Sequence, residues 1–109
     1  MINRLVVSAL EGIGVPVQFQ HYSGEADQYI TFFTYLDKPE QHADDEELIT
    51  GYYVQVDIWS KGDYTALAQT VHQKMLSAGF VKKAYYDLYE QDLKIYHKAM
   101  RFQLNKEVL

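Results

Sequence analysis

Two segments rich in β-branched and aromatic residues constrain the fold most. Tyr29–Leu36 reads Tyr-Ile-Thr-Phe-Phe-Thr-Tyr-Leu, and Leu48–Ser60 places Tyr52, Val54, Val56 and Ile58 on one face. Alternation with such residues predicts β-strands. Both faces of the first strand are apolar, which favours a central strand or one that meets a partner. The chain is therefore expected to fold around a β-sheet.

The stretch between these two strands is strongly acidic. Asp37–Glu47 contains Pro39 and ends in the run Asp44-Asp45-Glu46-Glu47. Nothing in it can pack a core, so the composition predicts a loop that joins the two strands as a long hairpin. Loops of this length are often functional or mobile.

Two segments have helical periodicity. Apolar residues recur at three- and four-residue spacing from Ile2 to Ile13, and Gly12 and Gly14 are expected to end this first helix. A second helix is predicted over Tyr64–Ala78, with Asp63 as its N-cap and Gly79 as its stop.

Three further strands complete the expected order. Val15–Phe19 alternates, but Pro16 limits it to a sheet edge. Phe80–Tyr89 and Lys94–Leu104 are extended and flank a polar turn at residues 90–92. The order helix, three strands, helix, two strands predicts a single α+β domain over residues 1–109, with a mostly antiparallel β-sheet packed with two α-helices.

Composition excludes several classes of function. Cysteine is absent, which excludes disulfides and thiolate metal sites. A net charge of −5 argues against a nucleic-acid-binding surface. No apolar run is long enough to span a bilayer, and no targeting segment is visible, so we expect neither a membrane nor a specific nucleic acid as partner.

Residues that could carry catalysis form only weak patterns. His21, His42, His72 and His97 lack the spacing of zinc ligands and are expected at the surface or half-buried. No serine lies in a glycine-flanked elbow, and no glycine-rich loop leads from a strand into a helix. We therefore expect no enzyme and no cofactor. The alternatives are a small metal-dependent, nuclease-like enzyme built on Asp87, Asp92 and Lys94, or a ligand- or peptide-binding module.

Tyrosine is unusually frequent, with ten residues among 109. It provides a large contact area at low entropic cost and is enriched at protein interfaces. Strands with two apolar faces also offer more sheet surface than two short helices can cover. An interaction protein is the class that these features favour.

The second half of the chain resembles a known family. The strand Tyr53-Val54-Gln55-Val56-Asp57-Ile58-Trp59-Ser60-Lys61, the helix 64–78 with its Gly79-Phe80 exit, Asp87-Leu88-Tyr89-Glu90 and the final strand 95–102 are similar to phage tail completion proteins. These are the tail-to-head joining and tail terminator proteins of long-tailed bacteriophages and prophages. The N-terminal helix fits the family only by its pattern.

The resemblance implies a structural role in virion assembly. Such proteins form a ring, commonly hexameric, at the head-proximal end of the tail tube, where they end tube growth or join the tail to the head. The implied partners are further copies of the chain, the tail tube protein and the head connector or head-completion protein. The implied location is the virion, with assembly in the bacterial host cytoplasm.

The family offers no catalytic residues and no motif for its ring contacts. We expect the segment Lys38–Glu47 to order on assembly against basic residues of a neighbouring subunit. The expected interface residues are the acidic Glu40, Asp44, Asp45, Glu46 and Glu47 and the basic Lys61, Lys82, Lys83 and Arg101.

Overall fold

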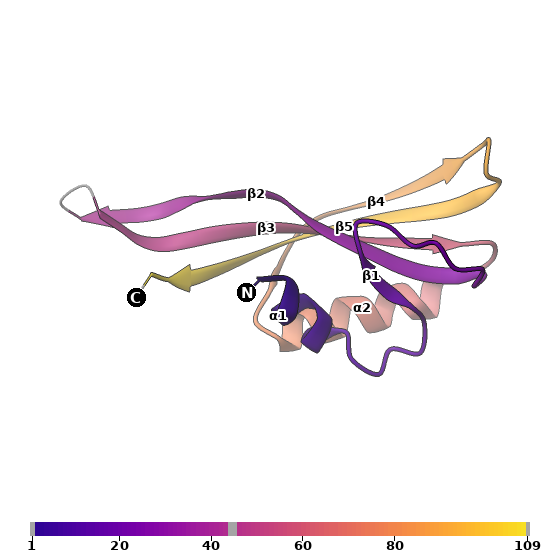
Figure 1. The fold of residues 1–109 in the computed structure, drawn as a ribbon, viewed down its shortest axis with the longest axis horizontal. Helices are drawn as coiled ribbons and strands as arrows, with labels where there is room; N and C mark the ends of the chain where they lie inside the picture. Colours follow the sequence, from indigo (N-terminus) through magenta and orange to yellow (C-terminus); the bar gives the residue numbers. More distant parts are fainter. Residues whose placement is uncertain (1, 44–45, 109) are drawn as a thin grey trace.

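The computed structural model describes residues 2–43 and 46–108 and consists of one sheet with two helices (Figure 1). The elements are α1 (Ile2–Ala9), β1 (Val17–Phe19), β2 (Gln28–Ala43), β3 (Glu46–Ser60), α2 (Thr65–Ser77), β4 (Val81–Glu90) and β5 (Ile95–Glu107). The predicted α+β class and the order of elements are confirmed.

The sheet has the strand order β1-β2-β3-β5-β4. All pairs are antiparallel except the edge strand β1, which runs parallel to β2 over three residues. Pro16 directly precedes this short strand, so its restriction to a sheet edge is also confirmed.

Both helices cover the same face of the sheet, below it in Figure 1. The core lies between them and this face. It joins Val6, Leu10, Val71 and Met75 from the helices to alternate strand residues, among them Ile30, Phe32, Val54, Val56, Ile58, Met100 and Phe102. The period of two in β3 and β5 places these residues on one face, as the sequence predicts.

The opposite face of the sheet carries no helix (Figure 1). We call it the open face and define it by Thr31 on β2, Gln55, Asp57 and Trp59 on β3, and His97, Ala99 and Arg101 on β5. These residues alternate with the core residues, and the register places Asp57 opposite both Thr31 and Ala99.

The predicted loop over Asp37–Glu47 is wrong. Strand β2 continues to Ala43 and β3 begins at Glu46, with Lys38 opposite Gly51 and His42 opposite Glu47. Strand β5 adds a third strand here, because Glu107 pairs with Ile49. The polar composition reflects a ribbon that packs no core, since backbone hydrogen bonds need no apolar side chains.

This ribbon projects beyond the helices, to the left in Figure 1. We call residues 37–43 and 46–51 the acidic arm. The projection makes the molecule long, with extents of 51 × 27 × 23 Å and a radius of gyration of 15.1 Å. A compact chain of this length has a radius of gyration of about 13 Å.

Two smaller expectations also differ from the structure. Helix α1 ends at Ala9, earlier than its apolar pattern, and the chain turns through Gly12 and Gly14, whose φ angles are positive. Tyr64, not Asp63, occupies the N-cap position of α2. The Asp63 carboxylate still accepts hydrogen bonds from the Thr65 amide at 2.9 Å and the Thr65 hydroxyl at 2.7 Å.

Candidate assembly surfaces

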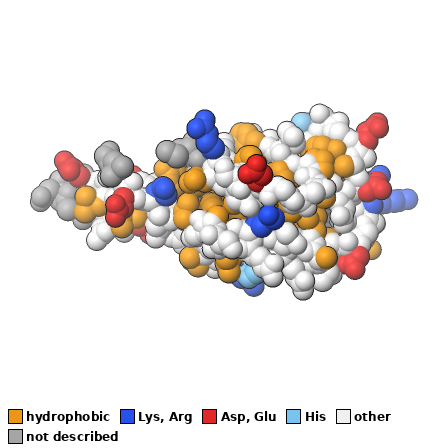
Figure 2. Space-filling view, turned by 90° about the horizontal axis from the view of Figure 1, so that it is seen from below, with side chains coloured by type: hydrophobic (Ala, Val, Ile, Leu, Met, Phe, Trp, Pro, Cys, Tyr) orange, Lys and Arg blue, Asp and Glu red, His pale blue; other side chains and the backbone are white. Residues whose placement is uncertain are grey.

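The segment 37–47, which includes most of the acidic arm, has the same net charge as the whole chain. Residues 37–47 contain six carboxylates and one lysine, a charge of −5, which equals that of the whole protein; the remaining nine basic and nine acidic residues cancel. Figure 2 shows the arm as the narrow end of the molecule, with red carboxylate atoms along it. The rest of the molecule is electrically balanced, so the arm dominates its long-range field.

The expected acidic interface residues that can be placed lie along this arm. Glu40 is held by the Tyr53 hydroxyl, which donates to its Oε1 at 2.5 Å, and by Lys38 at 3.8 Å. Glu46 is exposed, and Glu47 accepts a hydrogen bond from the Thr50 hydroxyl. Asp44 and Asp45 lie outside the described residues.

Gly51 allows Glu40 to lie across the arm. A Cβ atom at residue 51 would come within 2.6 Å of Glu40 Oε1, so a side chain there would displace the carboxylate. Glycine in a strand interior often marks such a close approach. The arm is thus a strand-paired ribbon in which the Glu40 and Glu47 carboxylates are held by contacts within the arm and with neighbouring Tyr53.

The four expected basic residues do not form one patch. Lys61 lies at the end of β3 and pairs with Asp27 at 3.4 Å. Arg101 is half-buried on the open face, where its Nε donates to Gln55 Oε1 at 2.9 Å and its guanidinium lies 4.9 Å from the centre of the Tyr35 ring. Both cations are therefore engaged within the chain.

Lys82 and Lys83 are adjacent at the start of the edge strand β4. Both are exposed, and the register shift between Lys82 and Ala84 forms a β-bulge there. Neither has a carboxylate within 4 Å among residues 2–43 and 46–108, and Lys82 Nζ lies 4.2 Å from the centre of the Tyr85 ring. Of the expected basic residues, these two are the ones free to meet an acidic partner.

A groove of about 630 Å³ lies beside Lys82, between α2 and strands β4 and β5. Its lining includes Tyr64, Gln69, His72 and Gln73 from the α2 side and Lys82, Tyr85, Asp87 and Lys98 from the sheet. Sequence reasoning missed this groove, because it exists only where the helix packs across the two strands.

Polar contacts inside the groove hold its base. The Tyr64 hydroxyl donates to Asp87 Oδ1 at 2.7 Å, and Lys98 Nζ donates to the same oxygen at 3.0 Å. Both bonds lower the pKa of Asp87, and the bond from Tyr64 has the larger effect. Burial, aided by the bond to Asp87, raises the pKa of Tyr64 to about 12, and burial raises that of Tyr85 to about 12.

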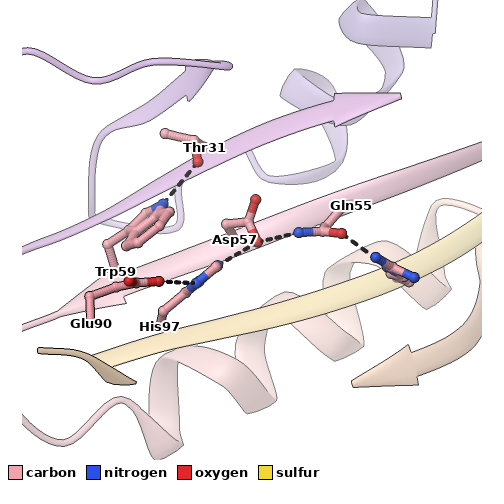
Figure 3. Close-up of polar contacts among 7 residues, drawn as sticks. Thr31, Gln55, Asp57, Trp59, Glu90 and His97 are labelled. Atoms are coloured by element: carbon pink, nitrogen blue, oxygen red, sulfur yellow. Dashed lines mark hydrogen bonds and ion pairs between the residues drawn. The ribbon is translucent and has the colours of Figure 1, made fainter. Parts of the chain in front are cut away.

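A polar network crosses the open face (Figure 3). Asp57 Oδ1 accepts hydrogen bonds at 2.7 Å from both His97 Nε2 and Gln55 Nε2. The Trp59 indole stacks on the His97 ring with centroids 3.8 Å apart, and its Nε1 donates to Thr31 Oγ1 at 2.9 Å. Asp57 and His97 are buried although no helix covers them, and Trp59 lies over the His97 ring.

His97 differs from its expected surface or half-buried position. It is only 8% exposed, and its Nδ1 lies 3.5 Å from Glu90 Oε1 without a hydrogen bond. In the sequence, this network was indicated only by the polar residues Gln55 and Asp57, which alternate with the apolar core residues of β3. The network includes Trp59 and, through Gln55, Arg101, and tryptophan and arginine are among the residues that contribute most at protein interfaces.

The nuclease alternative gains no geometric support. Asp87 is bonded to Tyr64 and Lys98 on the helix-covered face, whereas Asp92 and Lys94 lie in the turn between β4 and β5. Among the described residues, no group of three or more His, Cys, Asp or Glu could hold a metal ion. In that same part of the chain, no helix has the length and apolar character needed to cross a membrane.

Comparison with known proteins identifies a shared fold. No family model and no curated protein matches the sequence. Among solved structures, a chain of the "Virion of native gene transfer agent (GTA) particle" superposes with a TM-score of 0.62 at 10% sequence identity, covering 94% of this chain and 84% of that one. The chain is thus an α+β domain whose architecture is shared, nearly end to end, with a chain of a virion.

Proposed function

We propose that this protein is a structural component of a phage-like virion. The observation that carries the proposal is the fold shared with a virion chain over 94% of the sequence. Function is not implied by fold alone, so the surfaces of this chain must support an assembly role.

Those surfaces favour binding to other proteins. The acidic arm packs against neither helix, and the open face presents Tyr86 and Leu88, each 47% exposed, beside a rigid polar network. Neither feature is needed to build the core between the sheet and the helices. A catalytic role has no comparable support, since the described residues contain no group of three or more His, Cys, Asp or Glu that could hold a metal ion.

Within this class, we propose the tail completion role that the sequence resemblance implies. Copies of the chain form a ring, commonly of six subunits, at the head-proximal end of a long tail. The ring ends growth of the tail tube, or joins the tail to the head, through the tail tube protein and the head connector or head-completion protein. Unlike charges on one chain suit the head-to-tail contacts of such a ring.

The experiment that tests this role is deletion of the gene from the phage or prophage that carries it, followed by electron microscopy of the lysate. Overlong tubes are expected if the protein ends tube growth, and finished tails apart from filled heads if it joins them. Restoration by the gene supplied in trans is the control. Intact, infectious particles from the deletion strain would overturn the proposal.

A further inference from the structure

The negative charge of the acidic arm restricts which surface it can bind in an assembly. In a ring of identical chains, each copy brings a charge of −5 on residues 37–47. Contacts between two arms place like charges together and are unfavourable. A stable assembly therefore needs a cationic surface for each arm, on the next copy or on another protein.

We infer that the acidic arm of one copy docks along the groove between α2 and β4 of a second copy. This inference rests on the proposed ring and names its contact. Lys82 in the groove lining, and Lys83 next to it in the chain, supply positive charge without a carboxylate partner in the described residues, and Lys98, paired with Asp87, also lines the groove. The two surfaces are thus complementary in charge.

The dimensions of the two surfaces agree. Residues 37–43 of β2 span about 23 Å at about 3.3 Å per residue. Helix α2, with 13 residues, is about 20 Å long at 1.5 Å per residue. An arm laid beside α2 would therefore cover the groove along its whole length, over the rings of Tyr64 and Tyr85.

The contact is made by side chains and not by adding a strand to the sheet. Along β2 the register shifts at three places between Thr34 and His42, and Pro39 has no amide hydrogen to donate. Strand β4 has its own bulge at Lys83. Bulges, proline and lysine at an edge strand oppose edge-to-edge pairing. The free edge of β2 in the arm and the free edge of β4 both carry such features beside their charged residues.

The same charges select the order of subunits. Two grooves facing each other would bring Lys82 and Lys83 against their own copies, and two arms would bring carboxylates together. Arm-to-groove is the remaining pairing, and repulsion against the other two gives specificity. It is heterologous, and such contacts close into a ring when the rotation between subunits permits.

Cross-linking tests this contact directly, because the chain has no native cysteine. Gln41→Cys places a thiol on the arm and Gln73→Cys one in the groove, and neither changes a charge. Mixing the two single variants at millimolar concentration under mild oxidation should give disulfide-linked dimers. The matched control is Ala66→Cys, exposed on the same helix but outside the groove lining.

Three cross-linking results would overturn the inference. Dimers from Gln41→Cys alone would show arm-to-arm contact, and equal cross-linking to Ala66→Cys would show random collision; either overturns the inference. A chain that stays monomeric and gives no mixed dimer also overturns it. Each of these results is independent of the deletion phenotype, so the groove contact can fail while the virion role stands.

Charge exchange provides a second, independent test of the same contact. Glu46→Lys with Glu47→Lys, or Lys82→Glu with Lys83→Glu, should each weaken self-association about tenfold or more, measured by sedimentation. A mixture of the two double variants should restore association, because the unchanged acidic arm of the second variant then meets the unchanged lysines at the groove of the first. Failure of the mixture to associate, with both variants folded, would refute the pairing.

Discussion

At the scale of single residues, the open face shows how a polar group can be buried without a covering layer. Asp57 accepts hydrogen bonds from His97 and Gln55, and Trp59 lies flat against the imidazole. Each group is costly to bury alone and tolerable only when it is satisfied. The network therefore fixes side chains of β3 and β5 in one arrangement.

Replacement of Asp57 tests this network. Asp57→Ala leaves the His97 Nε2–H and the Gln55 amide without their acceptor, so we expect the free energy of unfolding to fall by about 3 kcal/mol. Urea denaturation measures it. Asp92→Ala, in the exposed turn, is the control and should change stability by less than about 0.5 kcal/mol. Equal effects of the two variants would show that the network contributes nothing.

The groove tyrosines give a prediction at alkaline pH. The pKa of Tyr64 and of Tyr85 is raised to about 12 in the folded protein, from the ordinary value of 10.0 for tyrosine. A raised pKa means stability that is fully present below pH 10 and is lost as pH rises through 12. Stability should therefore decline over this window, and tyrosinate absorbance should show two groups that titrate near pH 12.

Conservative replacement identifies these groups. Tyr85→Phe should remove one late-titrating group and flatten the alkaline decline, whereas Tyr89→Phe, at an exposed residue of the same strand, should leave Tyr64 and Tyr85 titrating as before. If both variants lose the same number of tyrosines that titrate near pH 12, the assignment of Tyr85 to this group is wrong.

At the scale of elements, strands β2 and β3 each have two parts, one that packs in the core and one that forms the acidic arm. Their halves beside the helices carry Phe32, Val54 and Val56 in the core, whereas the acidic arm is held by backbone pairing and local contacts. Ribbons without a core contribute little independent stability. The arm is thus an extension that the core supports and that serves contacts outside the molecule.

Shortening the arm separates these roles. Replacing residues 39–50 by a two-residue Asn-Gly turn, which suits a hairpin, should change the free energy of unfolding by no more than about 1 kcal/mol. Self-association should be lost. Phe102→Ala, which opens a cavity in the core, should cost about 4 kcal/mol by the same denaturation assay. A comparable loss from the shortened arm would show that the arm stabilises the fold.

At the scale of the whole molecule, the charge is divided between the segment 37–47, with a charge of −5, and a neutral remainder. Contacts between exposed charges weaken as salt screens them, with a screening length of about 10 Å at 0.1 M and about 3 Å at 1 M. An assembly joined through the arm should therefore respond to ionic strength.

Salt titration measures this response. The oligomer should dissociate as sodium chloride rises from 0.1 to 1 M, an effect of about tenfold in affinity. The charge-exchanged mixture should respond in the same direction. Assembly that strengthens with salt would indicate that apolar contacts, such as those of the open face, dominate instead.

The sequence by itself determined the class of fold, the order of elements and the core-facing residues of β3. The reason is that alternation of Val54, Val56 and Ile58 and the helical spacing of Ala68, Val71 and Met75 are local patterns that each bury one face. The edge position of β1 followed equally from Pro16, which cannot donate to a sheet.

Only the tertiary structure decided the arm, the groove and the open-face network. Residues 37–47 predicted a loop by composition, but their conformation is set by backbone pairing to β3 and by β5, which arrives more than fifty residues later. Likewise, Asp57 and His97 are 40 residues apart, and the groove needs α2 packed across β4 and β5. Such contacts depend on the register between distant segments, which no local pattern of side chains specifies.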